Sequence, residues 1–218
     1  MEKKAEKLLL DLEEKLNFLS ELGAEFIFSS KDSSSFSSLE SRILRCDRCS
    51  LSQTRKNAVP GEGNLKAELM FVGEAPGYDE DIQARPFVGK AGQLLTKIIQ
   101  AMKFEREDVY ITNVLKCRPP NNRTPHREEV ERCKPYLLEQ IETIKPEVIV
   151  ALGKVATDFF IPSNLGMMGL RGNFHEFQKI QVMPTFHPSY LIRNEGNKEI
   201  RKMVWEDMQK VMACLKKK

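Results

Sequence analysis

Apolar and polar positions follow different periods in different parts of the chain. Within residues 3–22, Ala5 and four leucines recur at steps of three or four residues, which predicts one amphipathic helix. Residues 29–38 contain seven serines in ten positions, and serine side chains compete with the backbone for hydrogen bonds. We therefore expect an irregular linker after an N-terminal helical extension.

From residue 68 onward, short apolar runs alternate with segments of helical periodicity. The runs at 68–73, 109–114, 147–153 and 181–186 are the expected strands, and residues 89–102, 127–143 and 198–214 are the expected helices. Strands that alternate with helices form parallel sheets. The sequence therefore predicts an α/β fold with three αβα layers and a central, mainly parallel sheet of four strands. We expect this domain to span residues 41–218, with residues 1–40 forming the helical extension and its linker.

Open α/β sheets bind ligands beyond the carboxyl ends of their strands. Three of the four expected strand ends carry polar or turn-forming residues, namely GEAPGYDED at 73–81, NVLKCRPPNNR at 113–123 and HPSYLIR at 187–193. These three stretches are the candidate site.

Composition narrows the class of protein. The chain has 218 residues, of which 41% are hydrophobic, so it has enough apolar residues for a substantial core. Its net charge of +3 is unevenly spread: residues 1–40 carry five lysines against nine acidic residues, and residues 41–218 carry 29 basic against 22 acidic residues. The basic part suits a polyanion, although ordinary solubility charge explains it equally well. No run is apolar enough to cross a membrane and no secretory signal precedes the domain, so we expect a cytoplasmic protein without a membrane partner.

Four of the five cysteines have the spacing of a metal site. Cys46 and Cys49 form a C-x2-C pair, and Cys117 and Cys133 follow as C-x15-C. Free thiols or metal ligands are more usual than disulfides in a reducing cytosol. Zinc and an iron–sulfur cluster both accept four thiolates, so the spacing leaves both open. We expect Cys214, in the last helix, to pack as a small apolar residue.

Taken together, GEAPGYDEDIQARPFVGKAGQLL, VYITNVLKCRPPNNRTP, the four cysteines and HPSYLIRN resemble the family 4 uracil-DNA glycosylases, the iron–sulfur members of their superfamily. The resemblance runs from about Cys46 to Met212 and excludes residues 1–40. It implies a [4Fe-4S] cluster of structural role on the four cysteines. It also implies a DNA repair enzyme that flips uracil out of DNA and hydrolyses its N-glycosidic bond, leaving an abasic site.

The same resemblance assigns the residues that meet the base. Phe87 matches the aromatic residue that stacks on uracil, and Asn113 matches the amide that reads the edge of the base. Ala75 lies in the substrate-binding motif, where better-known members of the superfamily place an aspartate that positions water. By resemblance, Glu74 and Glu80 are then the catalytic carboxylates.

His187 resembles the catalytic histidine of the family, which stabilises the departing uracil anion. Residues 188–193 match a loop that enters the minor groove, and the expected DNA contacts are Ser189, Leu191 and Arg193. Leu191 is the candidate for filling the vacated space, and Arg193 for meeting a phosphate. We expect the other two histidines, His126 and His175, to be surface or structural residues.

Two other functions fit parts of the sequence. One is a zinc-stapled, non-enzymatic module that binds nucleic acid, and the other is a nucleotide enzyme that uses GEAPG as an anion-binding turn. In the glycosylase interpretation, the partner is uracil-containing DNA, the protein is a monomer, and the N-terminal helix is a candidate docking element for another protein.

Overall fold

The computed structural model describes residues 30–215. The helix expected at 3–22 lies outside the described residues. The chain divides into two units, residues 1–35 and residues 36–218. The second unit contains the sheet and all the candidate site residues.

The core of the second unit is a six-stranded sheet in the order β1-β3-β2-β4-β6-β5. The four inner strands pair in parallel, whereas β1 and β5 pair antiparallel at the two edges. All four expected strands are confirmed. The two edge strands were not expected, because strands of two and three residues are too short to show an alternating pattern. The strands are β1 (Glu62–Gly63), β2 (Leu69–Gly73), β3 (Tyr110–Asn113), β4 (Val148–Leu152), β5 (His175–Phe177) and β6 (Ile180–Thr185).

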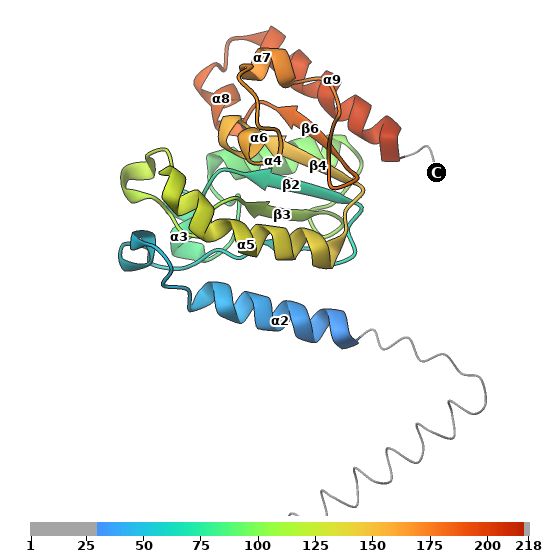
Figure 1. Ribbon diagram of the computed structural model, residues 1–218. Helices are drawn as coiled ribbons and strands as arrows, with labels where there is room; N and C mark the ends of the chain where they lie inside the picture. The colour runs from blue at the N-terminus through green and yellow to red at the C-terminus, as the bar shows by residue number, and fades with distance from the viewer. Residues whose placement is uncertain (1–29, 216–218) are drawn as a thin grey trace, which may run out of the picture. The chain divides into compact units, whose positions relative to one another are not determined.

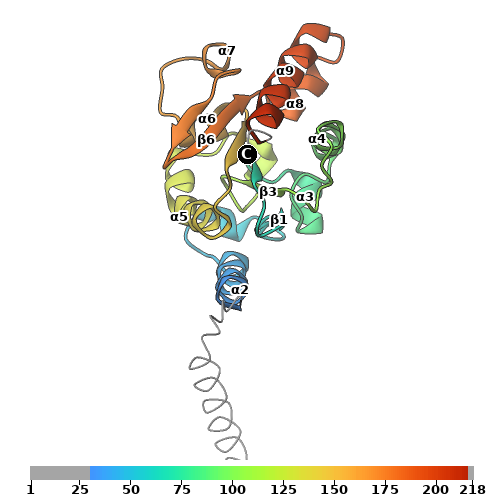
Figure 2. The ribbon, with the colours of Figure 1, turned by 90° about the vertical axis from the view of Figure 1, so that its right-hand side faces the viewer.

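Helices cover both faces of this sheet (Figures 1 and 2). One face packs against α4 (Lys90–Ala101) and α9 (Lys198–Leu215), and the other against α5 (Arg127–Ile144) and α6 (Lys154–Phe160). The three expected layers and long helices are thus confirmed. Shorter elements complete the described part: α3 (Tyr78–Gln83), α7 (Met167–Leu170), α8 (Pro188–Arg193), and the 3-10 helices η1 (Ser50–Gln53) and η2 (Pro120–Asn122). Within residues 30–215, no helix is long and apolar enough to span a bilayer.

The serine-rich stretch differs from its prediction. It opens a helix, α2 (Ser30–Leu44), so the expectation of an irregular linker is wrong from Ser30 onward. Phe36, Leu39 and Ile43 recur at helical spacing, and all three are buried in the core beside α5. Burying three large apolar side chains outweighs the weak helix propensity of serine, because tertiary packing supplies most of a helix's stability.

Cys214 also behaves as expected. It lies near the end of α9, half-buried against the core cluster that α9 forms with the sheet. Its packing as a small apolar residue is confirmed.

Candidate active site and cysteine cluster

The polar strand ends converge on one cleft of about 760 Å³. The carboxyl ends of β2, β3 and β6 each contribute to it, because parallel strands end at the same edge of the sheet. Of the nine residues expected to touch DNA, base or water, the cleft brings together eight: Glu74, Ala75, Glu80, Phe87, Asn113, His187, Ser189 and Arg193. The ninth, Leu191, does not line it.

Asn113 ends β3 and lines the cleft with only 2% of its surface exposed. Its side-chain Oδ1 is buried and has no hydrogen-bond partner. An unpaired buried acceptor costs about 1–3 kcal/mol, so a ligand that donates to Oδ1 recovers that energy on binding. The backbone carbonyl of Asn113 is fixed by the buried Lys116, whose Nζ donates to it over 2.6 Å.

Phe87 forms part of the cleft in an unusual backbone conformation. Its φ is +52°, in the left-handed region, which costs a residue with a side chain about 1–2 kcal/mol. Gly92 in α4 permits this path, since a Cβ there would overlap the Phe87 backbone. The Phe87 ring lies 5.7 Å from the His187 ring, centroid to centroid. The two rings therefore contribute adjacent walls of one cleft.

His187 is held as a neutral imidazole with a defined tautomer. Its Nδ1 accepts a hydrogen bond from the backbone N–H of Ser189 at 3.1 Å and lies 2.8 Å from Ser189 Oγ. Because Nδ1 is an acceptor, the proton of the neutral ring is on Nε2. Burial, aided by the positive charge of Arg193, lowers the pKa of His187 to about 4. At neutral pH the ring is therefore an uncharged donor through Nε2.

The backbone at Gly153 accommodates this histidine. Gly153 has φ +85°, and a Cβ added to it would lie 2.9 Å from the His187 Cβ. Glycine is the residue that adopts this conformation without strain and without blocking the ring. The β4 strand end thus contributes space rather than a functional group.

Glu74 is the carboxylate available in the cleft. It is half-buried, and burial raises its pKa, an effect that the charge of Arg193 partly offsets. The backbone amides of Gly77, Val88 and Gly89 donate to Glu80 and not to the Glu74 carboxylate. Glu74 can therefore hold a water molecule or stabilise positive charge.

Glu80 has a different role from the one expected. Its Oε1 accepts from the amides of Val88 and Gly89, both at 2.9 Å, and its Oε2 accepts from the amide of Gly77 at 3.1 Å. Both oxygens are thus committed to backbone donors. Glu80 joins the GEAPG turn to the segment that carries Phe87, and the expectation that it acts on water does not fit this geometry.

Leu191 also departs from its expected role. It is 4% exposed and packs with Phe186, Ile200 and Val204 in a small core cluster. Because residues 188–193 form the short helix α8, Leu191 turns inward to a hydrophobic core. The exposed neighbour is Tyr190, whose ring stacks on Phe186 at 5.0 Å between centroids. Tyr190 lines the cleft together with Ser189 and Arg193 of the same helix.

The four spaced cysteines come together although two of them lie far apart in sequence. Cys46, Cys49, Cys117 and Cys133 line a single small pocket, which Arg48, Arg55, Arg132 and Lys116 surround. The Nη1 of Arg55 lies 2.9 Å from the Cys117 sulfur. Four thiols beside three arginine side chains fit a group bound by negatively charged thiolates.

The sulfur atoms are not gathered as they would be around one ion. Within residues 30–215, no three cysteine, histidine or acidic side chains have the arrangement that holds a single metal ion. In a four-iron cluster each thiolate binds a different iron, so the ligands stand farther apart than around one zinc ion. The four thiols of the pocket equal the number of ligands that a four-iron cluster takes.

The two remaining histidines lie outside the cleft lining. His126 is exposed at the start of α5, where its backbone N–H donates to Glu129. His175 lies on the edge strand β5, with its Nε2 3.2 Å from the Leu170 carbonyl oxygen. Their expected surface or structural roles are confirmed.

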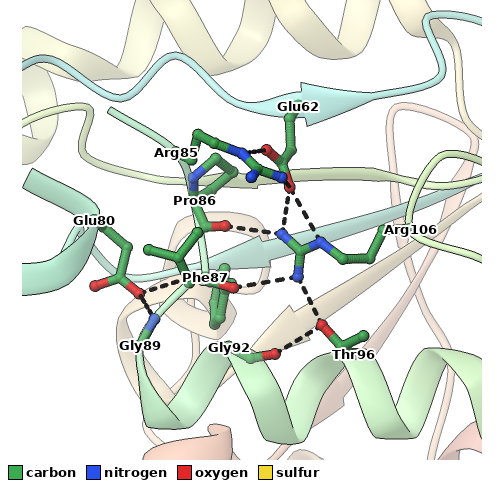
Figure 3. A network of polar contacts seen from close by, with 10 residues as sticks. Glu62, Glu80, Arg85, Pro86, Phe87, Gly89, Gly92, Thr96 and Arg106 are labelled. Carbon is green, nitrogen blue, oxygen red and sulfur yellow. Dashed lines mark hydrogen bonds and ion pairs between the residues drawn. The ribbon is translucent and has the colours of Figure 1, made fainter. Parts of the chain in front are cut away.

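Sequence reasoning missed the residues that hold the cleft walls. Arg106 contacts the carbonyls of Pro86 and Phe87, and Glu62 binds Arg106 from β1 (Figure 3). Both are charged residues in polar segments of the sequence, and nothing in their local sequence distinguishes them from solvent-exposed side chains. Gly92 did carry a signal, since it lies in the GKAG run quoted above.

The fold and cleft together define a class: an α/β protein that receives a flat, hydrogen-bonding ligand between an aromatic wall, a buried amide and a neutral imidazole. Comparison with known proteins identifies the family. The model of the uracil DNA glycosylase superfamily matches residues 60–209. The type-4 uracil-DNA glycosylase of Thermotoga maritima is 51% identical over 178 residues, which are 81% of this chain and 92% of that protein.

Two further type-4 uracil-DNA glycosylases are similarly close. That of Saccharolobus solfataricus is 48% identical, over 81% of this chain and 84% of its own length. That of Archaeoglobus fulgidus is 45% identical, over 81% of this chain and 91% of its own length. The chain therefore belongs to the type-4 uracil-DNA glycosylases of the uracil DNA glycosylase superfamily.

Proposed function

We propose that this protein is a DNA repair hydrolase that turns uracil out of DNA and cleaves its N-glycosidic bond, leaving an abasic site. The observation that carries the proposal is the unpartnered Oδ1 of Asn113, buried in a cleft whose other walls are Phe87 and His187. Uracil supplies a donor at N3 for this atom, and its flat ring suits the Phe87 face.

Base selection follows from the direction of hydrogen bonds at Asn113. Its amide accepts from uracil N3–H and donates to O4. Cytosine presents an acceptor at N3 and a donor at N4, so both contacts become repulsive. A site whose polar groups are left unpaired by the wrong ligand discriminates strongly against it.

Bond cleavage leaves negative charge on the uracil ring and positive charge on the sugar. The Nε2–H of neutral His187 donates to uracil O2, and this bond strengthens as O2 gains charge. Because the low pKa keeps His187 uncharged, it stabilises the anion without transferring a proton. Glu74 positions the attacking water or stabilises the sugar cation, and Ser189 and Arg193 contact the DNA backbone beside Tyr190.

The four cysteines Cys46, Cys49, Cys117 and Cys133 hold a [4Fe-4S] cluster. Burial raises the pKa of Cys133 to about 12, and metal binding offsets this cost because iron takes the thiolate form. When bound, the cluster would cross-link the chain before η1, the chain after β3, and α5. Cys117 and Cys133 lie on either side of the loop 118–123, which borders the cleft. We assign it a structural role.

The enzyme interpretation is favoured over the zinc-stapled binding module and the free-nucleotide enzyme, because the cleft unites base-reading and leaving-group residues. We further propose that the protein is cytoplasmic, which accords with its free thiols. We also propose that it is a monomer and that its N-terminal segment is an accessory element that docks another protein.

The proposal is tested by incubating the purified protein with labelled DNA containing one U:G pair, one U:A pair or one uracil in a single strand. Alkali-labile sites should form at uracil and at no position of undamaged DNA. If the well-folded protein cleaves none of the three substrates, the proposed function is wrong. Binding of free nucleotides without action on DNA would favour the nucleotide enzyme instead.

A further inference from the structure

The segment that carries Phe87 is held from two sides by charged side chains. The left-handed φ of Phe87 is uncommon for an aromatic residue, and such a conformation persists only where the surroundings fix it. Figure 3 shows Arg106 and Glu80 approaching the segment 86–89 from opposite sides. Each contributes more than one hydrogen bond to its backbone.

Arg106 lies in the turn between α4 and β3. Its Nη2 donates to the Pro86 carbonyl oxygen at 2.9 Å, and its Nη1 donates to the Phe87 carbonyl oxygen at 3.2 Å. A guanidinium group presents its donors in a rigid plane. Bonds to two successive carbonyls therefore fix the peptide units on both sides of the Phe87 Cα, and so the direction of its ring.

Arg106 is itself anchored at two points. Its Nε donates to Glu62 Oε1 at 3.1 Å, and its Nη1 donates to Thr96 Oγ1 at 3.0 Å, which ties it to α4. Burial acts to raise the pKa of Glu62, but hydrogen bonds from Arg85 and Arg106 outweigh it and lower the pKa overall. Glu62 is therefore a charged anchor at neutral pH.

The Phe87 ring meets Asn113 across Gly73. A Cβ on Gly73 would overlap both the Asn113 Oδ1 and the Phe87 ring. The stacking face and the base-reading amide thus share one narrow slot. A small displacement of the Phe87 backbone would change where a base sits relative to Asn113.

We propose that Arg106, anchored by Glu62, is a positioning residue for base excision that acts through Phe87. This inference rests on the proposed function. Arg106 does not line the cleft and makes no contact with the base; it sets the ring on which the base stacks.

The test is a double-mutant cycle between Arg106 and Phe87. Single-turnover excision of uracil is measured at saturating enzyme for Arg106→Gln in the wild-type and the Phe87→Ala backgrounds. With Phe87 present, Arg106→Gln should slow excision by about tenfold to 10²-fold, the cost of misplacing a positioned group. In the Phe87→Ala background, Arg106→Gln should slow excision by no more than about twofold. The effects of two independent residues would add, whereas Arg106 should have little effect once the Phe87 ring is gone.

Arg85→Gln is the matched control. Arg85 also binds Glu62, over 2.8 Å, but its side chain is 61% exposed and it makes no hydrogen bond to the carbonyls of Pro86 or Phe87. It should stay within about twofold of wild type, as expected for an exposed ion pair. Arg106→Lys keeps the charge opposite Glu62 but loses the planar fork, so it should remain slow. It also carries the comparison if Arg106→Gln does not fold.

Calorimetric binding of free uracil adds a readout that needs no excision. Affinity should fall in Arg106→Gln and hold in Arg85→Gln. If Arg106→Gln keeps the wild-type rate and uracil affinity, or loses the same factor with and without the Phe87 ring, Arg106 is a general structural residue and the inference is wrong. Wild-type protein that neither excises nor binds uracil would overturn the proposed function, and this inference with it.

Discussion

Asn113 and His187 present opposite hydrogen-bonding groups to the cleft. Asn113 presents an acceptor that has no partner in the protein, whereas His187 has its acceptor nitrogen satisfied by Ser189 and presents its donor. Together they match the N3–H donor and the O2 acceptor of uracil. The proposed mechanism therefore divides recognition and leaving-group stabilisation between two side chains with fixed hydrogen-bond direction.

Changing Asn113 to Asp should lower excision of uracil and create activity on cytosine. A carboxyl group can accept from the cytosine amino group, where the asparagine amide would set donor against donor. Excision assays on matched uracil and cytosine substrates measure the change. Asn113→Ala is the control, and it should lose uracil excision without gaining cytosine. Wild-type uracil excision by Asn113→Ala would remove Asn113 from the pocket.

The pH dependence of excision should show that His187 is neutral far below its ordinary pKa. Glu74→Gln removes the cleft carboxylate whose pKa burial raises, so its residual single-turnover rate should hold through pH 6.5 and fall only near the His187 pKa of about 4. In the wild type, the acid limb should lie at higher pH, because burial raises the pKa of Glu74. A midpoint near 6.5 in Glu74→Gln would contradict the assignment. The lowered pKa of His187 also makes the free energy of unfolding depend on pH, because the unfolded chain takes up the proton at higher pH than the folded protein does. This contribution to stability is fully present above pH 6.5 and is lost as the pH falls through about 4.

At the scale of elements, the loop 118–123 joins the two candidate sites. Cys117 precedes it, and Arg118 within it donates to Asn122 and lies over the exposed ring of Tyr78. Asn122 in turn lines the cleft. The loop therefore links the cysteine pocket to the cleft, and through it the proposed cluster would support the site without touching the base.

Replacing Cys117 with Ser should lose bound iron and solubility together, since metal binding in such sites is linked to folding. Iron content, visible absorbance and the soluble fraction measure this. Cys214→Ser is the control and should change none of them, because Cys214 packs against α9 and the sheet, away from the four-thiol pocket. A Cys117→Ser protein that is folded, colourless and fully active would show that the cluster assignment is wrong.

The long elements could be predicted from sequence because their patterns are strong. The four inner strands are short apolar runs, and the three long helices repeat an apolar period over 12 to 18 residues, so burial in the sheet or against it follows directly. Helix α2 was not predicted, because its serines suggest a linker and the burial of Phe36, Leu39 and Ile43 in the core is visible only in the folded chain. The short strands β1 and β5 left no pattern, although β1 supplies Glu62.

The candidate site shows the same division. The motif residues were located by resemblance, and eight of nine line the cleft. The burial of Leu191 and the amide contacts of Glu80 could not be predicted, because both depend on the local turn of the backbone rather than on residue type. Arg106 was missed for a related reason: an arginine between helix and strand gains its role only from carbonyls nineteen and twenty positions earlier in the chain.

For the whole molecule, the boundary of the catalytic unit lies before the core residues of α2. Deleting residues 1–29 should spare uracil excision, since the second unit begins at Phe36. Deleting residues 1–40 should instead destabilise the protein, because it removes the buried Phe36 and Leu39, and each such loss costs about 2–5 kcal/mol. Thermal unfolding and excision of the two truncations compare them. An inactive but well-folded 30–218 protein would show that the N-terminal segment belongs to the site.

The central claim is that His187 acts on the departing base, and single-turnover excision measured beside equilibrium DNA binding tests it most directly. In His187→Ala, the rate at saturation should fall by about 10² to 10³, because the lost donor acts mainly on charge that develops during cleavage. Affinity for uracil-containing DNA should stay nearly unchanged, since it rests on phosphate contacts. His175→Ala, in the edge strand, should match wild type in both. A hundredfold loss of affinity with an unchanged rate at saturation would make His187 a docking residue and contradict the account.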